Sequence, residues 1–205
     1  MTISLSDIAK RFNREWIFRR FSYKFHTGQS YAITGPNGSG KSTLLQVIGG
    51  AIAPSTGKII YSIDDIEKDA ESAYQYLSFA APYLELIEEM TLTELLTFQQ
   101  KFKPFLNGIS QSEMLQHFNL QPAAQKQIRY FSSGMKQRVK LLLAFFADTV
   151  CVLLDEPCTN LDEPGVELYH QLIKKYCSGR LVIVSSNEER EYNFCKERIN
   201  ILDFK

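Results

Sequence analysis

The segment from residue 35 to residue 43 has the residue types and the spacing of a phosphate-binding loop. It fits the pattern G-x-x-x-x-G-K-[ST] and consists of Gly35, Pro36, Asn37, Gly38, Ser39, Gly40, Lys41, Ser42 and Thr43. Glycines allow the backbone to curl, so that successive N–H groups point at phosphate oxygens. In such a loop Lys41 reaches the β- and γ-phosphates of a nucleotide, and the Ser42 hydroxyl ligates Mg²⁺. A simple glycine-rich turn is the alternative interpretation.

A strand and a helix flank this loop in the order that phosphate binding requires. The run Tyr31-Ala32-Ile33-Thr34 is apolar and favours a strand, and residues 43–48 favour a helix that ends at Gly49-Gly50. The N-terminus of that helix adds partial positive charge beside the phosphates. This context favours nucleotide binding over a simple turn.

A second chemical constellation is the acidic pair Asp155-Glu156, which follows the apolar run at residues 150–154. In a parallel sheet the carboxyl ends of the strands face the ligand crevice, as the phosphate-binding loop does. Asp155 is therefore expected to hold Mg²⁺, directly or through water. Glu156 is expected to orient and deprotonate the water that attacks the γ-phosphate. An ordinary turn or helix cap is the alternative interpretation of the pair.

The elements that must position these residues alternate between strand and helix. Residues 2–34 favour β-structure and are expected to form an N-terminal antiparallel part. Further strands are predicted at residues 58–61, 74–79, 150–154, 181–184 and 198–202. Helices are predicted at residues 135–146, after an Asp162 cap with Pro164 in the first turn, and at residues 188–195. This alternation predicts an α/β fold with a mostly parallel sheet core, and the phosphate-binding loop within it predicts the P-loop NTPase type.

The segment of about residues 84–130 differs in character from the rest. Apolar residues recur at near-helical spacing after residue 91, and Thr91 or Thr93 is expected to cap that helix. A second short helix is predicted from Ser112 to Phe118. We expect one domain over residues 1–205 with this segment as an inserted helical subdomain.

Composition limits the classes of partner and the cellular compartment. Lys and Arg total 23 and balance 23 Asp and Glu, so no nucleic-acid partner is expected. Four cysteines show no metal-binding spacing and are expected to be reduced thiols in a cytosolic protein. No signal peptide and no transmembrane helix are expected from the sequence.

A third motif, residues 131–138, carries a resemblance to a known family. The sequence Phe-Ser-Ser-Gly-Met-Lys-Gln-Arg resembles the LSGGQ signature of the nucleotide-binding subunits of ATP-binding-cassette (ABC) transporters. Taken alone, Ser-Ser-Gly before a helix is a common helix cap. Between a phosphate-binding loop and Asp155-Glu156 it is diagnostic of this family. Residues 159–162 resemble the D-loop of the family, and the Ser-Ser-Gly-Met variant is similar to that of some exporter subunits.

The resemblance implies a mechanism and partners. Two such subunits, copies or relatives, pair head to tail, and ATP on one phosphate-binding loop is covered by Ser132 and Gly134 of the other. Hydrolysis opens the dimer, and an integral membrane transporter subunit couples this cycle to transport. The resemblance places the chain in the cytoplasm, at the inner face of the cell membrane. It also aligns Phe12 with an aromatic that stacks on adenine, although a half-buried strand aromatic is the alternative.

The sequence departs from the family pattern at two groups that sense the γ-phosphate. No Gln stands near residues 80–83, where the family has one that senses Mg²⁺ and the attacking water. The family's switch His falls near residue 187, which here is Asn187, a hydrogen-bond donor that cannot become positively charged. The fifth signature position is Met135 instead of Gln. Losing one positioned donor commonly costs ~10²–10³ in rate, so these changes argue against fast hydrolysis, whereas the complete pair Asp155-Glu156 favours a working ATPase.

Two functions therefore remain open. One is a transport ATPase with a modified site, in which Asn187 or water substitutes for the missing groups. The other is a slow ATP-gated dimerisation module with a regulatory role and weak hydrolysis. The apolar loop at residues 82–87 is either a docking site for the membrane subunit or part of the packing inside the helical subdomain.

Overall fold

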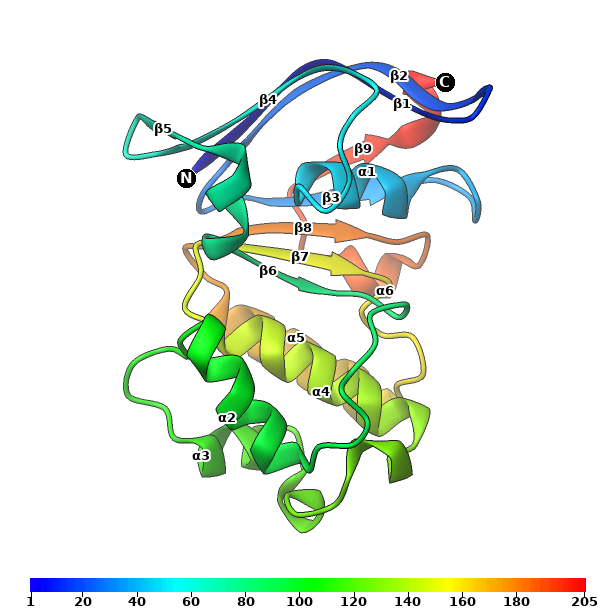
Figure 1. The fold of residues 1–205 in the computed structure, drawn as a ribbon. Helices are drawn as coiled ribbons and strands as arrows, with labels where there is room; N and C mark the ends of the chain where they lie inside the picture. Colours follow the sequence, from blue (N-terminus) through cyan, green and yellow to red (C-terminus); the bar gives the residue numbers. More distant parts are fainter. The chain divides into compact units, whose positions relative to one another are not determined.

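A computed structural model describes all 205 residues of the chain (Figure 1). The chain divides into two compact units. The first unit contains Met1–Phe79, Thr149–Glu156 and Gly179–Lys205, and the second contains Ala80–Asp148 and Pro157–Ser178.

The first unit begins with an antiparallel sheet, as the sequence predicts for the N-terminal part. Its strand order is β2-β1-β4-β5. The bounds are β1, Thr2–Phe12; β2, Glu15–His26; β4, Thr56–Ile63; and β5, Ile66–Lys68. β1 pairs with β2 from Thr2 opposite His26 to Phe12 opposite Glu15, which forms a long hairpin. β1 and β2 each bury only some of their side chains, and regular alternation is interrupted where their pairing register shifts, first between Leu5 and Ile8.

A parallel sheet forms the second layer of the first unit and confirms the predicted sheet type. Its strand order is β6-β7-β8-β3-β9. The bounds are β3, Ser30–Thr34; β6, Leu77–Ala80; β7, Cys151–Asp155; β8, Leu181–Ser185; and β9, Glu197–Asn200. Every residue of β7 and β8 is buried, which explains their continuous apolar sequence.

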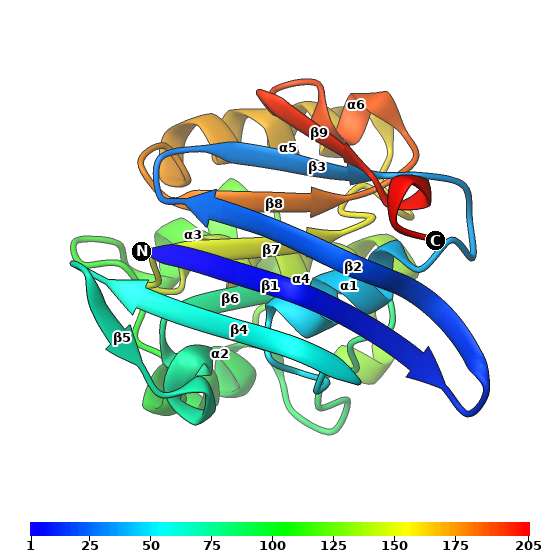
Figure 2. The ribbon, with the colours of Figure 1, turned by 90° about the horizontal axis from the view of Figure 1, so that it is seen from above.

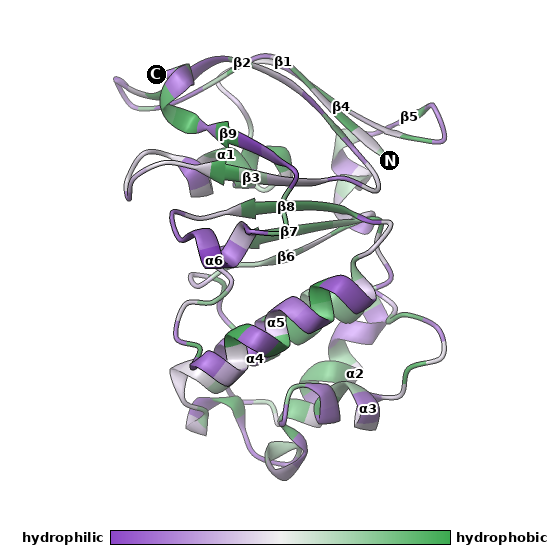
Figure 3. Cartoon of the chain, turned by 180° about the vertical axis from the view of Figure 1, so that it is seen from behind, coloured by the Kyte–Doolittle hydropathy of each residue, from purple (hydrophilic) through white to green (hydrophobic).

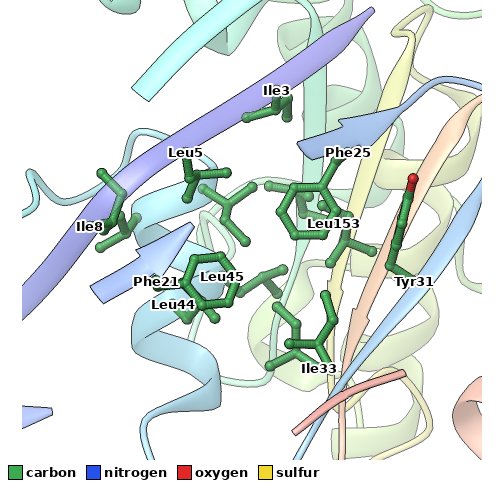
Figure 4. Packing of buried hydrophobic residues seen from close by; sticks show 14 of the residues in the cluster. Ile3, Leu5, Ile8, Phe21, Phe25, Tyr31, Ile33, Leu44, Leu45 and Leu153 are labelled. Atoms are coloured by element: carbon green, nitrogen blue, oxygen red, sulfur yellow. The ribbon is translucent and has the colours of Figure 1, made fainter. Parts of the chain in front are cut away.

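Helix α1, Lys41–Ile48, lies between these two sheets. Viewed from above, the antiparallel strands cross over α1 and the parallel strands (Figure 2). Apolar side chains from β1, β2, α1 and β7 meet in one buried cluster, in which Ile3, Phe25, Leu45 and Leu153 are almost inaccessible to solvent (Figure 4). The cluster holds α1, and therefore the loop before it, firmly in place.

The second unit is helical. Its helices are α2, Leu92–Phe102; α3, Gln111–His117; α4, Ser133–Phe146; and α5, Glu163–Tyr176. Thr91, rather than Thr93, caps α2 in a capping box with Glu94, and Asp162 caps α5 as predicted. Helix α5 alternates apolar and polar residues along its length (Figure 3), with Val166, Tyr169 and Ile173 buried. The boundary of a helical insertion at residues 84–130 stays a prediction.

Three predicted elements differ from the structure. Residues 74 and 75 belong to a 3₁₀ turn, Ala70–Gln75, which Asp69 caps, so that the strand starts only at Leu77. Helix α6 covers only Glu189–Tyr192 of the predicted residues 188–195. The last strand ends at Asn200, whose side chain accepts a hydrogen bond from the N–H of Leu202 and starts a 3₁₀ turn, Ile201–Phe204. In both 3₁₀ turns a side chain just before the turn accepts a backbone N–H, and this local hydrogen bond replaces the strand pairing that the sequence predicts.

No helix of the chain combines the length and the apolar character that crossing a membrane requires.

Candidate nucleotide-binding site

The loop between β3 and α1 has the curled backbone that the sequence pattern requires. Gly35, Gly38 and Gly40 have positive φ angles of 143°, 74° and 101°. A Cβ atom on Gly40 would lie 2.3 Å from the Ile17 Cγ2 atom, so that only glycine fits there. Gly40 is also the N-cap of α1, and no side chain caps this helix end. The first N–H groups of α1 therefore remain available to an anion.

Lys41 and Ser39 carry the polar side chains inside the loop. Lys41 is only 4% exposed, and its ammonium donates hydrogen bonds to the carbonyl oxygens of Gly35 at 2.9 Å and Pro36 at 3.2 Å. The Ser39 hydroxyl is buried and has no hydrogen-bond partner within the protein. A buried hydroxyl usually has a partner, so this one fits a phosphate oxygen as acceptor.

A cavity of about 210 Å³ opens at the loop and brings the two sequence motifs together. Its lining consists of Ile17, Asn37, Gly38, Gly40, Lys41, Ser42, Thr43 and Glu156. Glu156 follows β7 with a positive φ of 41°, and its N–H donates to the carbonyl of Ser185 at 2.9 Å. Only β8 separates β7 from β3, so the strand order brings this carboxylate to the phosphate-binding loop, as the sequence predicts.

The oxygen donors near the loop are of the kind that Mg²⁺ prefers. Ser42 lines the cavity from the first turn of α1, and the Asp155 carboxylate is 1% exposed at the carboxyl end of β7. A hydroxyl and a carboxylate, completed by phosphate oxygens and water, form a suitable ligand set for this ion. The residues of this chain thus fit the Mg²⁺ that the nucleotide would bring.

Asn187 and the segment without a Gln lie at strand ends. Asn187 is exposed and follows β8, beside Ser186, whose N–H donates to the carbonyl of Ile33 at 3.1 Å. Asn187 is not among the residues that line the cavity. Ala80 and Ala81, at the end of β6, are fully buried and offer no polar side chain.

Ile17, for which no role was predicted, lines the cavity, whereas Phe12 does not. Phe12 ends β1, is 49% exposed and does not line the cavity, and the ammonium of Lys10 lies 5.0 Å from its ring centroid. An aromatic at a strand end with about half of its surface exposed agrees with the half-buried alternative, and stacking of this ring on adenine stays a prediction. Ile17, in β2, is the apolar side chain in the cavity wall, and sequence reasoning missed it because it resembles every other alternating residue of that strand.

The predicted signature residues lie in the second unit. Ser132 is exposed and caps α4 by accepting a hydrogen bond from the N–H of Met135 at 3.2 Å. A Cβ atom on Gly134 would lie 2.9 Å from the carbonyl oxygen of Asn160, so the signature packs directly against the D-loop-like segment. The capping interpretation and the signature interpretation of Ser132 are therefore compatible.

Two polar contacts within the second unit reinforce this packing. The buried Gln137 amide donates to the carbonyl of Pro157 at 2.8 Å. Arg138 donates to the Asp162 carboxylate at 2.9 Å, and this bond lowers the pKa of Asp162. Sequence reasoning did not assign roles to Gln137 and Arg138, because their partners lie 20 and 24 residues away.

The fold and this site define a P-loop protein that binds nucleotides. The family model described as ABC transporter matches residues 18–159, a range that contains the phosphate-binding loop, the signature and the acidic pair. The chain belongs to the ABC transporter family. The ATP-binding cassettes of this family are ATPases, and the predicted family and fold class of the chain are confirmed.

Relatives and solved structures agree with this assignment. The linearmycin resistance ATP-binding protein LnrL of Bacillus subtilis (strain 168) is 27% identical over 98% of this chain and 66% of its own length. The human retinal-specific phospholipid-transporting ATPase ABCA4 is 29% identical over 89% of this chain and 8% of its own length. A dimeric ATP-binding cassette in a post-hydrolysis state with ADP and Pi has the same fold, with a TM-score of 0.83, 24% identity, and coverage of 97% of this chain and 94% of that one.

This chain therefore spans 66% of the length of LnrL and a small part of ABCA4.

Proposed function

We propose that this chain binds Mg²⁺-ATP and hydrolyses it to drive transport through a separate membrane-spanning subunit. The observation that carries the proposal is the shared cavity, whose lining includes Lys41, Ser42 and Glu156. Phosphoryl transfer to water needs a cation, a hydroxyl that can ligate a metal and a carboxylate near the phosphate, and this cavity provides all three.

The chain's own residues perform most of the chemistry by position. The N–H groups of the loop and of the start of α1 hold the phosphates, and Lys41 neutralises charge on the β- and γ-phosphates. Glu156 orients the attacking water and accepts its proton. Ser42 and Asp155 would hold Mg²⁺, which would supply further charge neutralisation at the phosphates. Asn187 donates a hydrogen bond to a γ-phosphate oxygen, and Phe12 stacks on the adenine.

The ATPase proposal predicts a strong dependence of turnover on Glu156. We expect Glu156→Gln to reduce steady-state hydrolysis by ~10²–10⁴-fold, because the amide cannot accept the proton of water. ADP binding should stay near that of the natural protein, which separates chemistry from binding. Equal turnover in the two proteins would refute the ATPase mechanism and favour the slow ATP-gated switch.

A head-to-tail dimer completes the site in this proposal, with Ser132 and Gly134 of a second copy covering the γ-phosphate. The exposure of Ser132 and the dimeric form of the cassette with ADP and Pi support it. We expect Glu156→Gln with Mg²⁺-ATP to form a dimer by light scattering. Adding Ser132→Glu, whose carboxylate repels phosphate, should abolish that dimer, whereas the control Ser112→Glu on α3 should retain it. A monomer at high protein concentration would contradict the sandwich.

We further propose that the membrane subunit docks on the loop of residues 82–89, which places the chain peripherally at the cytoplasmic face of the membrane. A cavity of about 680 Å³ runs between this loop and two lysines of α4, Lys136 and Lys140. Leu84 and Ile87 are each 38% exposed, which supports docking over internal packing of the loop. The Ser-Ser-Gly-Met signature supports export as the direction. Co-purification with a membrane subunit, lost on Ile87→Asp, tests this docking.

A further inference from the structure

Residues 200–205, called here the C-terminal support, contact the phosphate-binding loop from the side of the core. Strand β9 pairs in parallel with β3, and Asn200 lies opposite Thr34. The residues that directly follow these two strand ends are Ile201 after β9 and Gly35, the first loop glycine, after β3. The Asn200 side chain accepts the Leu202 N–H at 3.1 Å and turns the chain away after this contact.

Ile201 packs directly against the first loop glycine. It is fully buried, and a Cβ atom on Gly35 would lie 2.8 Å from the Ile201 Cγ2 atom. Carbon atoms pack at about 3.5–4.0 Å, so the Cγ2 methyl already occupies the space beside the Gly35 backbone. The same added Cβ would lie 2.9 Å from the Ser39 hydroxyl, which is the buried hydroxyl without a partner.

The support reaches the other end of the loop through Ile17. The Lys205 ammonium donates to the Ile17 carbonyl at 2.8 Å, and Ile17 is the residue that packs against Gly40. The Phe204 ring packs on Phe21 of β2, with ring centroids 4.6 Å apart. The C-terminal support thus contacts Gly35 directly and Gly40 through Ile17. Its contacts span more than 160 residues of sequence.

We propose that Ile201 is a positioning residue of the nucleotide site. Its Cγ2 methyl fixes the position of the Gly35 backbone relative to the core and thereby the direction of the loop N–H groups. The inference rests on the proposed nucleotide binding but adds a residue that the chemistry itself does not use. Without that methyl the loop backbone can move toward the core, and the phosphate hydrogen bonds lose their alignment.

Two substitutions separate this role from simple packing. Ile201→Val is smaller but keeps Cγ2, whereas Ile201→Leu conserves volume but loses the β-branch methyl; both are mild changes in a core. We expect Ile201→Leu to bind Mg²⁺-ADP about tenfold more weakly by calorimetry, the loss expected from one misaligned phosphate contact, and Ile201→Val to bind within about twofold of the natural protein. Amide exchange of residues 35–41 without nucleotide should be faster in the Leu variant only.

The matched control is Ile199→Leu, at a buried position in β9, two residues before Ile201, whose partner is Ile33 rather than the loop. It should lose a similar amount of thermal stability but keep its ADP affinity. The inference is overturned if the Leu and Val variants at residue 201 bind ADP equally, if the Val variant is weaker, or if the natural protein does not bind ADP. If ADP binds but hydrolysis does not depend on Glu156, the proposed ATPase fails and the role of Ile201 stands.

Discussion

At the scale of single residues, glycine is favoured at two positions of the same loop for different physical reasons. Both Gly38 and Gly40 have positive φ angles, which cost other residues about 1–2 kcal/mol. Only Gly40 also lacks room, because Ile17 Cγ2 occupies the place of a Cβ atom, whereas nothing lies within 4 Å of one on Gly38. The contact of Gly40 with Ile17 of β2 therefore requires glycine at residue 40.

We predict that Gly38→Ala lowers stability by about 1 kcal/mol and binds Mg²⁺-ADP within a few-fold of the natural protein. Gly40→Ala should be more destabilised and should bind ADP at least about tenfold more weakly, because the loop must shift. Ile17→Ala in the same chain should recover part of the affinity by opening space. Equal losses in the two single variants, measured by urea unfolding and calorimetry, would contradict the steric explanation.

At the scale of elements, a carboxylate joins two helices of the second unit. Asp162 caps α5 by accepting the Gly165 N–H at 3.2 Å and pairs with Arg138 of α4. The hydrogen bond from Arg138 is the main reason that the pKa of Asp162 is lowered. A lowered carboxyl pKa in the folded state contributes stability above the unfolded pKa, and this contribution is lost as the pH falls through the folded pKa.

We therefore predict that Asp162→Asn is less stable than the natural protein at pH 7, although asparagine still caps a helix well. The difference in urea midpoint should shrink as the pH falls below about 4, where the unfolded carboxyl becomes protonated. Glu163→Gln, next in the chain, is the control and should show a smaller pH-dependent difference. If the difference in urea midpoint between Asp162→Asn and the natural protein were independent of pH, an ionic contribution of Asp162 to stability would be excluded.

At the scale of the whole molecule, burial protects every thiol. Cys151 and Cys195 lie in the first unit, Cys158 and Cys177 lie in the second, and all four are buried cysteines outside any disulfide. Burial raises the pKa of Cys151 and of Cys195 to about 12 each. Since the thiolate is the reactive form, these side chains behave as apolar core residues.

We predict that iodoacetamide at pH 8 leaves the folded protein unlabelled over the time in which it labels all four thiols in urea, as read by mass spectrometry. Slow labelling in the folded state should report the opening of each unit separately. Rapid labelling of Cys151 in the folded protein would contradict the buried parallel sheet.

Much of the fold follows from local patterns in the sequence. The continuous apolar runs before Glu156 and after Gly179 predict buried parallel strands, and the Asp162 cap predicts the start of α5. Short-range competition explains the errors: Asp69 and Asn200 supply side-chain acceptors that turn the chain where strand residues are expected. The length of α6 was overestimated because its few apolar residues do not mark where a helix ends.

For the site, local sequence alone predicts the groups for phosphate and metal, because residues 35–43 are contiguous and their chemistry is local. It also identified Asp155 and Glu156, since a buried strand predicts where its end lies. Only the tertiary structure decided which distant residues support that chemistry. Ile17 against Gly40, Ile201 against Gly35 and Gln137 against Pro157 are contacts across long sequence separations, and no pattern of apolar or polar residues encodes such pairings.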